Sequence, residues 1–501
     1  MPTALDRFDS GRGGEALNRV GQIGGCQDKV IEQLSGHAPN RTTLRVRCDL
    51  GDIGCANRSR NLGVTRMDCS NREAEMGLAE VSLLGGWFPV ALELVAAGLL
   101  VTAIGWRDRR WRTRVLPLVI GLSAVGALLA SYPGAELAGI TDPLPFGVWF
   151  WFGVGLTALV VLIAGWQSAQ WWRRGIAVLA IGVATVVCAN QVNQFVGYYP
   201  TIDAAVSDWT DAPLPGQVSM TGLAQDSGGH TLPKAGKLVS VDIPATYSGF
   251  DHRAELVYLP PVWFRSKHHP ALPVVEVIGG ERGAPHDWVR LGNAVHVADA
   301  YAQRHHGFAP ILVFVDATAS FDNDTECVDG PRGNAATHLD RDVPQYVEKT
   351  FGASRNPAQW AVAGFSMGGT CAIDLVVEHP DTFTHFVDIS GDLEPNSGDD
   401  HDTLIQLYGG SVASEQANEP LKVMQAHGKY TGVSGMFLTS TAEKTHQREA
   451  HQLSRQAAKV GIPSTVQVSP GSHVWQFAGP AFAKSFPWLV SQLTPTHHRS
   501  A

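Results

Sequence analysis

The residues best suited to chemistry lie in the motif Gly364-Phe365-Ser366-Met367-Gly368. The apolar segment 359–363 before it is typical of a short buried strand, and segment 368–377 after it is typical of a helix that opens with small residues. Strand, sharp turn and helix are the context of a G-x-S-x-G nucleophile elbow, where glycines let a crowded turn close. Since the bare pattern is common by chance, this context carries the prediction that Ser366 is a nucleophile.

A serine hydroxyl needs a base to remove its proton and an acid to orient that base. In α/β-hydrolases the three come in the chain order Ser, acid, His. His473 lies in segment 470–475, between the last expected strand and the closing helix. We therefore expect His473 to be the base, against the alternative that it is merely one of 19 histidines in a turn.

The acid is expected after the preceding strand, and Glu443 follows the apolar segment 435–438. The alternative role for Glu443 is an exposed carboxylate favoured at a helix N-terminus. Asp392, one strand earlier, is the competing acid, and Glu449 is a weaker third choice.

An oxyanion hole needs two backbone N–H groups aimed at the developing charge. We expect one from Met367, directly after the nucleophile. The other is expected from Gly280 or Glu281 in the glycine-rich segment 279–284, which follows a predicted strand. The alternative is that this segment is only a tight turn.

The elements that position these residues alternate between strands and helices from Lys237 onward. Segments 237–245 and 254–259 suggest an opening antiparallel pair. Alternation of this kind predicts a mostly parallel sheet with helices on both faces, in the order of an α/β-hydrolase over residues 237–495. The later expected strands are 272–278, 310–316, 359–363, 385–389, 435–438 and 464–468, and the expected helices are 288–304, 342–351, 368–377, 444–460 and 475–493.

Ahead of this domain, four apolar stretches approach the length that spans a bilayer, at 83–106, 115–132, 146–166 and 175–195. Buried soluble helices are the alternative. We predict a four-helix transmembrane region over 76–196, a linker over 197–236 that is rich in Gly, Ser, Thr and Pro, and a short tail over 496–501.

The loops predict the orientation of these spans. Segment 107–114 holds five arginines and segment 171–174 holds two, whereas segment 131–146 has no Lys or Arg. Arg-rich loops stay in the cytoplasm. We therefore expect a multi-pass protein of the cell membrane with its catalytic domain on the extracytoplasmic side.

The first 75 residues do not fit this orientation, because they are arginine-rich and show no secretory signal pattern. We expect translation to begin at Met76 or Met67, with residues 1–75 either disordered or outside the native product. The rival interpretation is a zinc module, but the cysteines include no C-x2-C pair. They are Cys26, Cys48, Cys55 and Cys69.

Cys327 and Cys371 are the cysteines of the C-terminal domain. In an oxidising compartment they could form a disulfide that pins segment 317–339 beside the nucleophile helix. Two buried free thiols are the alternative.

The charge of the chain bears on which partners it can bind. The 501-residue chain has a net charge of -9, and its basic clusters lie beside the apolar spans and in the N-terminal region. We therefore expect no nucleic-acid partner, and we expect no metal and no cofactor. The sequence indicates no oligomeric state.

Four segments of the chain resemble one family. They are segments 324–329 and 339–344, the elbow 363–369, and segment 471–475. Together they resemble an esterase family that includes esterase D-like enzymes and the secreted mycolyltransferases of the antigen 85 group, over about residues 235–495. The resemblance implies serine acyl-enzyme chemistry in or near the cell envelope, with Ser366, Glu443 and His473 as the triad.

The leading hypothesis is a membrane-anchored serine esterase or acyltransferase that acts on ester-linked lipids or glycans. One alternative is an inactive hydrolase-like envelope scaffold, which the presence of Ser366 and His473 opposes. Another is a transporter or sensor, but the spans hold no central acid–base pair that would mark a transport path.

Overall fold

The structure is a computed structural model that describes residues 81–105, 108–137, 144–166, 169–210, 212–226, 232–266 and 268–494. The predicted N-terminal extension, its cysteines and the two candidate start residues lie outside the described residues, as does the predicted tail.

Four long apolar helices come first in the described chain. Each is long and apolar enough to cross a membrane. Large apolar side chains such as Leu94, Leu128 and Ile163 are 69%, 72% and 66% exposed, where a soluble helix carries polar groups. Outward-facing apolar side chains fit a lipid environment, as the sequence predicts. The helices are α2 (Trp87–Ile104), α3 (Leu116–Leu137) with a π-helical turn before it (Trp111–Val115), α4 (Phe146–Gly165) and α5 (Trp171–Val196).

Inside this group of helices, small and aromatic side chains pack together. Ala96 of α2, Trp151 of α4 and Val187 of α5 form one buried cluster. Gln191 Nε2 donates to Glu93 Oε1 over 2.7 Å, so the carboxylate of α2 faces an amide of α5. A polar side chain within a span is stabilised by a partner of this kind.

The segment predicted as a linker is more structured than expected. It contains α6 (Ile202–Trp209), β1 (Gln217–Val218) and α7 (Met220–Asp226). Thr201 caps α6, because its hydroxyl accepts from the amide of Ala204 over 3.2 Å. β1 pairs in parallel with β2, so this segment forms an edge of the sheet. Its Gly, Pro and Ser content obscured these short capped elements.

The sheet has nine strands in the order β1-β2-β3-β5-β4-β8-β9-β10-β11. β3 pairs antiparallel with both β2 and β5, and the other neighbours are parallel. The predicted α/β-hydrolase fold and its opening antiparallel pair are confirmed. The strands after β1 are β2 (Lys237–Val241), β3 (Glu255–Leu259), β4 (Val274–Ile278), β5 (Ile311–Val315), β8 (Trp360–Phe365), β9 (His385–Ile389), β10 (Ser434–Ser440) and β11 (Ser464–Ser469).

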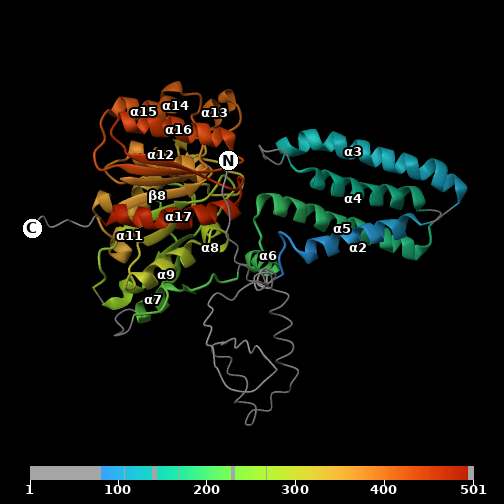
Figure 1. The fold of residues 1–501 in the computed structure, drawn as a ribbon, viewed down its shortest axis with the longest axis horizontal. Coiled ribbons are helices and arrows are strands. Elements are labelled where there is room, and N and C mark those ends of the chain that lie inside the picture. Colours follow the sequence, from blue (N-terminus) through green and yellow to red (C-terminus); the bar gives the residue numbers. More distant parts are fainter. Residues whose placement is uncertain are drawn as a thin grey trace, which may run out of the picture. The chain divides into compact units, whose positions relative to one another are not determined.

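Helices cover both faces of the sheet, with α12 and α16 on one side and α9 and α17 on the other (Figure 1). The predicted helix 288–304 is divided in two, because Asn293 adopts a left-handed conformation with φ 55°. Three helices between β9 and β10 were not predicted. The α-helices of four or more residues in the domain are α8 (Asp287–Arg290), α9 (Ala294–Arg304), α11 (Val343–Phe351), α12 (Met367–Glu378), α13 (Asp400–Gln406), α14 (Val412–Ala417), α15 (Pro420–His427), α16 (Lys444–Lys459) and α17 (Trp475–Leu493).

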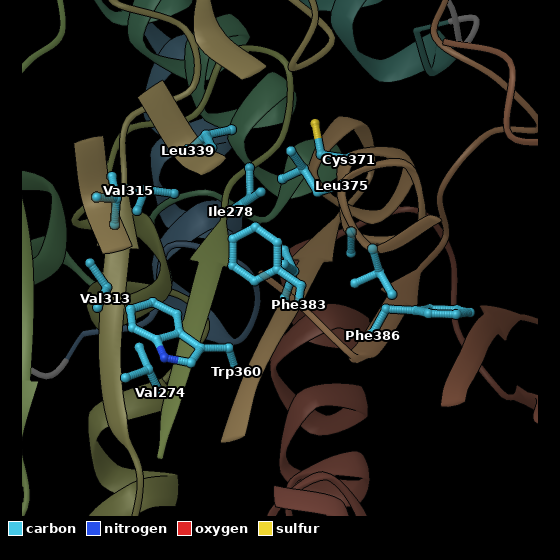
Figure 2. Packing of buried hydrophobic residues seen from close by; sticks show 14 of the residues in the cluster. Val274, Ile278, Val313, Val315, Leu339, Trp360, Cys371, Leu375, Phe383 and Phe386 are labelled. Carbon is cyan, nitrogen blue, oxygen red and sulfur yellow. The ribbon is translucent and has the colours of Figure 1, made fainter. Parts of the chain in front are cut away.

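The central strands are buried on both faces, and their side chains alternate between two cores. Val274 and Ile278 of β4 join the core under α11 and α12, where Trp360 and Phe383 also pack (Figure 2). Val275 joins the core under α9 and α17. Parallel pairing brings the carboxyl ends of β4, β8, β9, β10 and β11 to one edge of the sheet, which is where sites form in such folds.

Candidate active site

Ser366 stands at the turn between β8 and α12. Its backbone has φ 60° and ψ -125°, a conformation that is rare for a residue with a side chain. The amide of Ser366 donates to the carbonyl of Ile389 on β9 over 2.9 Å, which fixes the turn to the neighbouring strand. Ser366 is half-buried as a residue, whereas its neighbours on β8 and α12 are buried.

Glycines make this turn possible. A Cβ on Gly364 would lie 1.9 Å from the carbonyl oxygen of Gly368. A Cβ on Gly368 would lie 2.4 Å from the carbonyl oxygen of Ile278 at the end of β4. Both contacts are too short for any side chain, so the two glycines of the motif are required by close backbone approach. This arrangement is the elbow geometry that the sequence motif predicts.

A continuous hydrogen-bonded chain leaves Ser366. His473 Nε2 lies 2.8 Å from Ser366 Oγ, and His473 Nδ1 lies 2.5 Å from Glu443 Oε1. The histidine stands between β11 and α17, and Glu443 stands between β10 and α16. These are the two connections in which the sequence placed the base and the acid. The arrangement can move a proton from Oγ to Nε2 while Glu443 orients the ring.

Glu443 is held in its ionised form. Its second oxygen accepts hydrogen bonds from Ser390 Oγ and from the amide of Ser440, both over 2.9 Å. Burial alone would raise the pKa of Glu443, but hydrogen bonds from His473 and Ser440 outweigh it and lower the pKa to about 2. A carboxylate fixed in this way keeps Nδ1 of the imidazole protonated and leaves Nε2 free to accept.

Neither of the two alternative acids forms a hydrogen bond or an ion pair with His473. Asp392 Oδ1 lies 3.2 Å from His446 Nε2, and Asp392 Oδ2 accepts from Asn396 over 3.1 Å. Glu449 lies beside the same pair, with a carboxylate oxygen within 4.8 Å of an Asp392 oxygen and of a His446 ring nitrogen. Sequence order alone left Asp392 and Glu449 open as acids. The hydrogen-bond geometry favours Glu443.

His446 is a second histidine at the site, and the sequence reasoning missed it. Its Nδ1 lies 3.4 Å from Glu443 Oε1, and its ring stacks on that of His473 with centroids 5.2 Å apart. Burial alone would lower the pKa of His446, but the hydrogen bond to Asp392 and the charge of Glu443 raise it to about 9. The three-residue spacing from Glu443 on one helix is a signal that could have revealed it.

The loop expected to supply the oxyanion hole lies beside the nucleophile. A Cβ on Gly280 would lie 3.5 Å from Ser366 Cβ and 4.0 Å from Ser366 Oγ. Met367 is the first residue of α12, and the first amides of a helix have no intrahelical acceptor. The amides of Met367 and of Gly280 or Glu281 thus come from two segments that meet at Ser366.

Side chains distant in sequence hold this loop in place. Arg253 Nη2 donates to the carbonyl of Gly283 over 2.8 Å and to Asp316 Oδ1 over 2.6 Å. Asp316 stands directly after β5 and is almost fully buried. The guanidinium therefore joins the loop after β4 to the end of the neighbouring strand, as a planar fork of donors can. No sequence motif indicated this contact.

The predicted disulfide between Cys327 and Cys371 is present, with Cα atoms 5.6 Å apart. It joins the loop after β5 to α12, the helix that follows Ser366. Glu326 and Cys327 both have positive φ, 48° and 54°. The cross-link thus fixes an unusually shaped segment against the nucleophile helix.

Groups able to ligate a metal ion occur at two places among the described residues. One lies at the triad itself, where His446 stands beside Glu443 and His473, with Asp392 and Glu449 next to it. The other is the buried set His252, Glu255 and His338. There the two nitrogens of His252 face the carbonyls of Arg253 and Ile243, 2.9 and 2.6 Å away, so they are already hydrogen-bonded.

Comparison with known proteins bears on the same domain. Residues 251–489 match the model of the family described as "Putative esterase". The resemblance found from the sequence motifs is thereby confirmed for the C-terminal domain. The match indicates a serine hydrolase or acyltransferase, as predicted.

The chain is also similar to individual proteins. It is 29% identical over 411 residues to an uncharacterized protein of Corynebacterium glutamicum, covering 78% of this chain and 92% of that protein. A match of this extent reaches into the residues before Lys237, because residues 237–501 form little more than half of the chain.

Several solved structures are similar at lower identity. An S-formylglutathione hydrolase from Agrobacterium tumefaciens is 16% identical with a TM-score of 0.44, covering 53% of this chain and 98% of that chain. A ferulic acid esterase is 19% identical with a TM-score of 0.43, covering 52% and 99%. MPT51 of Mycobacterium tuberculosis is 16% identical with a TM-score of 0.39, covering 51% and 98%.

Proposed function

We propose, on the premise that residues 251–489 form an esterase-family domain, that this protein is a membrane-anchored serine esterase or acyltransferase. Its substrates are ester-linked lipids or glycans of the cell envelope. The observation that carries the proposal is the unbroken hydrogen-bonded chain from Ser366 through His473 to Glu443. A histidine placed between a serine hydroxyl and a buried carboxylate is the arrangement that makes the serine nucleophilic.

In the first half-reaction, Nε2 of His473 takes the proton of Ser366 while Oγ attacks the ester carbonyl carbon. The carbonyl oxygen becomes an oxyanion and accepts hydrogen bonds from the amides of Met367 and of Gly280 or Glu281. His473 then gives its proton to the alcohol oxygen of the ester, the carbon–oxygen bond breaks, and the acyl group remains on Oγ.

In the second half-reaction, a water molecule or an acceptor alcohol gives its proton to Nε2 of His473 and attacks the acyl carbon. The tetrahedral intermediate collapses, the bond to Oγ breaks, and His473 returns the proton to Ser366. Glu443 stays ionised throughout, since its hydrogen bonds lower its pKa to about 2, and its charge stabilises the imidazolium in both halves.

The proposed location rests on the apolar helices and on the charges beside them. The four helices could each cross a membrane. Arg109, Arg110, Arg112 and Arg114 precede or begin the second span, and Arg173 and Arg174 begin the fourth. The positive-inside rule then places these ends in the cytoplasm and the hydrolase domain outside. On that side the domain acts at the membrane surface, where lipid and glycan esters of the envelope are found.

The catalytic proposal is tested with the full-length protein in detergent and a p-nitrophenyl ester of a short acid. Ser366→Ala is expected to lower kcat/KM by about 10⁴-fold or more, because the hydroxyl supplies the nucleophile. Ser454→Ala on α16 is the control and keeps the wild-type rate. Activity of the Ser366→Ala protein above about a tenth of the wild-type value contradicts the proposal.

The location is tested by labelling single cysteines with a membrane-impermeant maleimide in intact cells. A cysteine in place of Gly216 is expected to react, and a cysteine in place of Thr113 is expected to react only after the membrane is opened. The reverse pattern places the hydrolase domain in the cytoplasm and overturns the envelope substrate.

A further inference from the structure

A buried carboxylate connects the oxyanion loop to the segment that leaves the last apolar helix. Asp287 is the first residue of α8 and only 1% exposed. One of its oxygens accepts from the hydroxyl of Tyr198 over 2.7 Å. The other accepts from the amide of Ala284 over 2.8 Å. Each carboxylate oxygen thus joins a different part of the chain.

The Ala284 side of this contact is the oxyanion loop itself. The amide of Gly283 donates to the carbonyl of Gly280 over 2.8 Å, and the amide of Asp287 donates to the carbonyl of Ala284 over 3.0 Å. A Cβ on Gly283 would lie 2.9 Å from Gly280 O and 3.4 Å from Asp287 Oδ2. The carboxylate therefore packs directly on the turn that presents Gly280 to Ser366.

Tyr198 belongs to a segment that several hydrogen bonds hold against the end of α5 and against α6. Tyr198 stands two residues after the end of α5. Next to it, the amide of Tyr199 donates to Asn193 Oδ1 over 2.6 Å, and Asn193 Nδ2 donates to the carbonyl of Tyr199 over 2.9 Å. The hydroxyl of Tyr199 donates to Asp208 Oδ2 over 2.6 Å. The last turn of α5 and the segment after it are therefore fixed to each other.

A second contact joins the same two regions. Asp208 of α6 forms an ion pair with Arg290 of α8, and its Oδ1 lies 2.9 Å from Nε2 of His286, the residue before Asp287. His286 also lies 3.6 Å from Asp287 Oδ1. Without the Tyr198 hydroxyl, this longer contact with His286 is the polar contact that remains to that buried oxygen. A buried carboxylate oxygen that loses its donor is costly, so Asp287 gains by turning toward another donor and away from Ala284.

We propose that Tyr198 and Asp287 are positioning residues for the oxyanion hole, so that the segment leaving the fourth apolar helix is part of the catalytic apparatus rather than a passive tether. This inference rests on the proposed function. It implies that the tyrosine hydroxyl fixes the position of the Gly280 amide through Asp287 and Ala284. A displacement of the loop lowers transition-state stabilisation and leaves the serine, the histidine and the glutamate in place.

The test compares Tyr198→Phe with Tyr258→Phe in the full-length protein in detergent. Tyr258 is a matched control, because its hydroxyl also donates to a carboxylate oxygen, Asp299 Oδ1, over 2.7 Å. Tyr258 lies on β3, outside the oxyanion loop. Tyr198→Phe is expected to lower kcat for a p-nitrophenyl ester about tenfold while KM changes less than about twofold. Tyr258→Phe is expected to keep the wild-type kcat.

A second readout isolates the oxyanion hole from general stability. The inhibition constant of a trifluoromethyl ketone, which forms a tetrahedral oxyanion on the serine, is expected to rise about tenfold in Tyr198→Phe and not in Tyr258→Phe. Asp287→Asn keeps the side-chain volume and is expected to show at least the same loss. Equal kcat and equal ketone affinity in the two tyrosine variants overturn this inference. If Ser366→Ala is as active as the wild type, the proposed function fails instead.

Discussion

The two halves of the candidate site are built in different ways. In the triad half, the side chains that we propose to do the chemistry touch one another directly, with His473 2.8 Å from Ser366 and 2.5 Å from Glu443. In the oxyanion half, the groups that we propose to do the chemistry are backbone amides, and the side chains that hold them come from elsewhere in the chain. Arg253 donates a hydrogen bond to the carbonyl of Gly283, and Asp287 accepts one from the amide of Ala284.

This difference teaches what each kind of substitution does. Removing a triad side chain deletes a chemical group, whereas removing a loop-holding side chain leaves every reacting group present but displaced. The first kind of loss is large and the second is intermediate. Substitutions farther from both halves act on stability alone, which gives a graded set of tests.

The largest effect after loss of the nucleophile is expected at the acid. Glu443→Gln removes the charge that stabilises the imidazolium of His473 and is expected to lower kcat on the order of 10³- to 10⁴-fold. Steady-state kinetics with a p-nitrophenyl ester measures it. Asp392→Asn is the matched control and is expected to cost less than about tenfold, because Asp392 bonds His446 rather than His473. If Asp392→Asn lowered kcat by more than about 10³-fold and Glu443→Gln did not, the acid would be Asp392.

An intermediate effect is expected at the loop. Arg253→Lys keeps the charge but cannot reproduce the fork that binds Asp316 and Gly283 together. We expect kcat to fall about 10- to 100-fold. Substituting His473 or Glu443 is expected to lower kcat by a similar further factor in the Arg253→Lys protein as in the wild type. Thermal unfolding of the same protein supplies the control. A lower Tm with an unchanged kcat would make Arg253 a purely structural residue.

The disulfide separates stability from chemistry. Its 44-residue loop constrains the unfolded chain. Cys327→Ala together with Cys371→Ala is therefore expected to lower the free energy of unfolding by about 2–4 kcal/mol. At temperatures where the variant is folded, kcat is expected to stay within about threefold of the wild type, because neither sulfur touches the triad. A loss comparable to that of Glu443→Gln would mean that the 317–339 loop takes part in the reaction.

The smallest effect is expected at His446, and it depends on pH. The pKa of His446 is about 9 in the folded protein, mainly through Asp392, against about 6.5 for an unperturbed histidine. A raised folded-state pKa contributes stability that is fully present below about pH 6.5 and is lost as pH rises through about 9.

Solvent screening at half-exposed Asp392 limits this contribution to about 1–2 kcal/mol. The Tm difference between wild type and His446→Gln is therefore expected to be larger at pH 6.5 than at pH 9.5. An equal difference at both pH values would show that packing of the ring, and not its charge, is what matters.

The sequence predicted the parts of the molecule that follow local rules. Elements such as β9 and α17 were placed within a residue of their observed bounds because apolar runs mark buried strands and helices. The elbow was recognisable because Gly364 and Gly368 must flank a turn of this shape. Position in the chain order predicted Glu443 and His473, which the structure brings into hydrogen-bond contact with each other and with Ser366, although it left Asp392 open.

The remaining features depend on contacts that no local pattern encodes. His446 reaches the triad because Asp392, from another strand end, holds its ring. Tyr198 reaches Asp287 across 89 residues of sequence, and Asp287 in turn binds the amide of Ala284 in the oxyanion loop. The elements inside segment 197–236 were not foreseen, because short capped helices and a two-residue strand resemble a linker in composition. In each case the physical cause is tertiary pairing of polar groups, which spacing alone cannot reveal.

The central claim, that Ser366 is a nucleophile activated by His473, is tested most directly by locating a covalent adduct. The full-length protein is treated with a fluorophosphonate, digested, and analysed by mass spectrometry. One adduct on the peptide that carries Ser366 is expected, absent from Ser366→Ala and formed about 10³-fold more slowly in His473→Gln. An adduct on another residue, or undiminished labelling of either variant, would contradict the account.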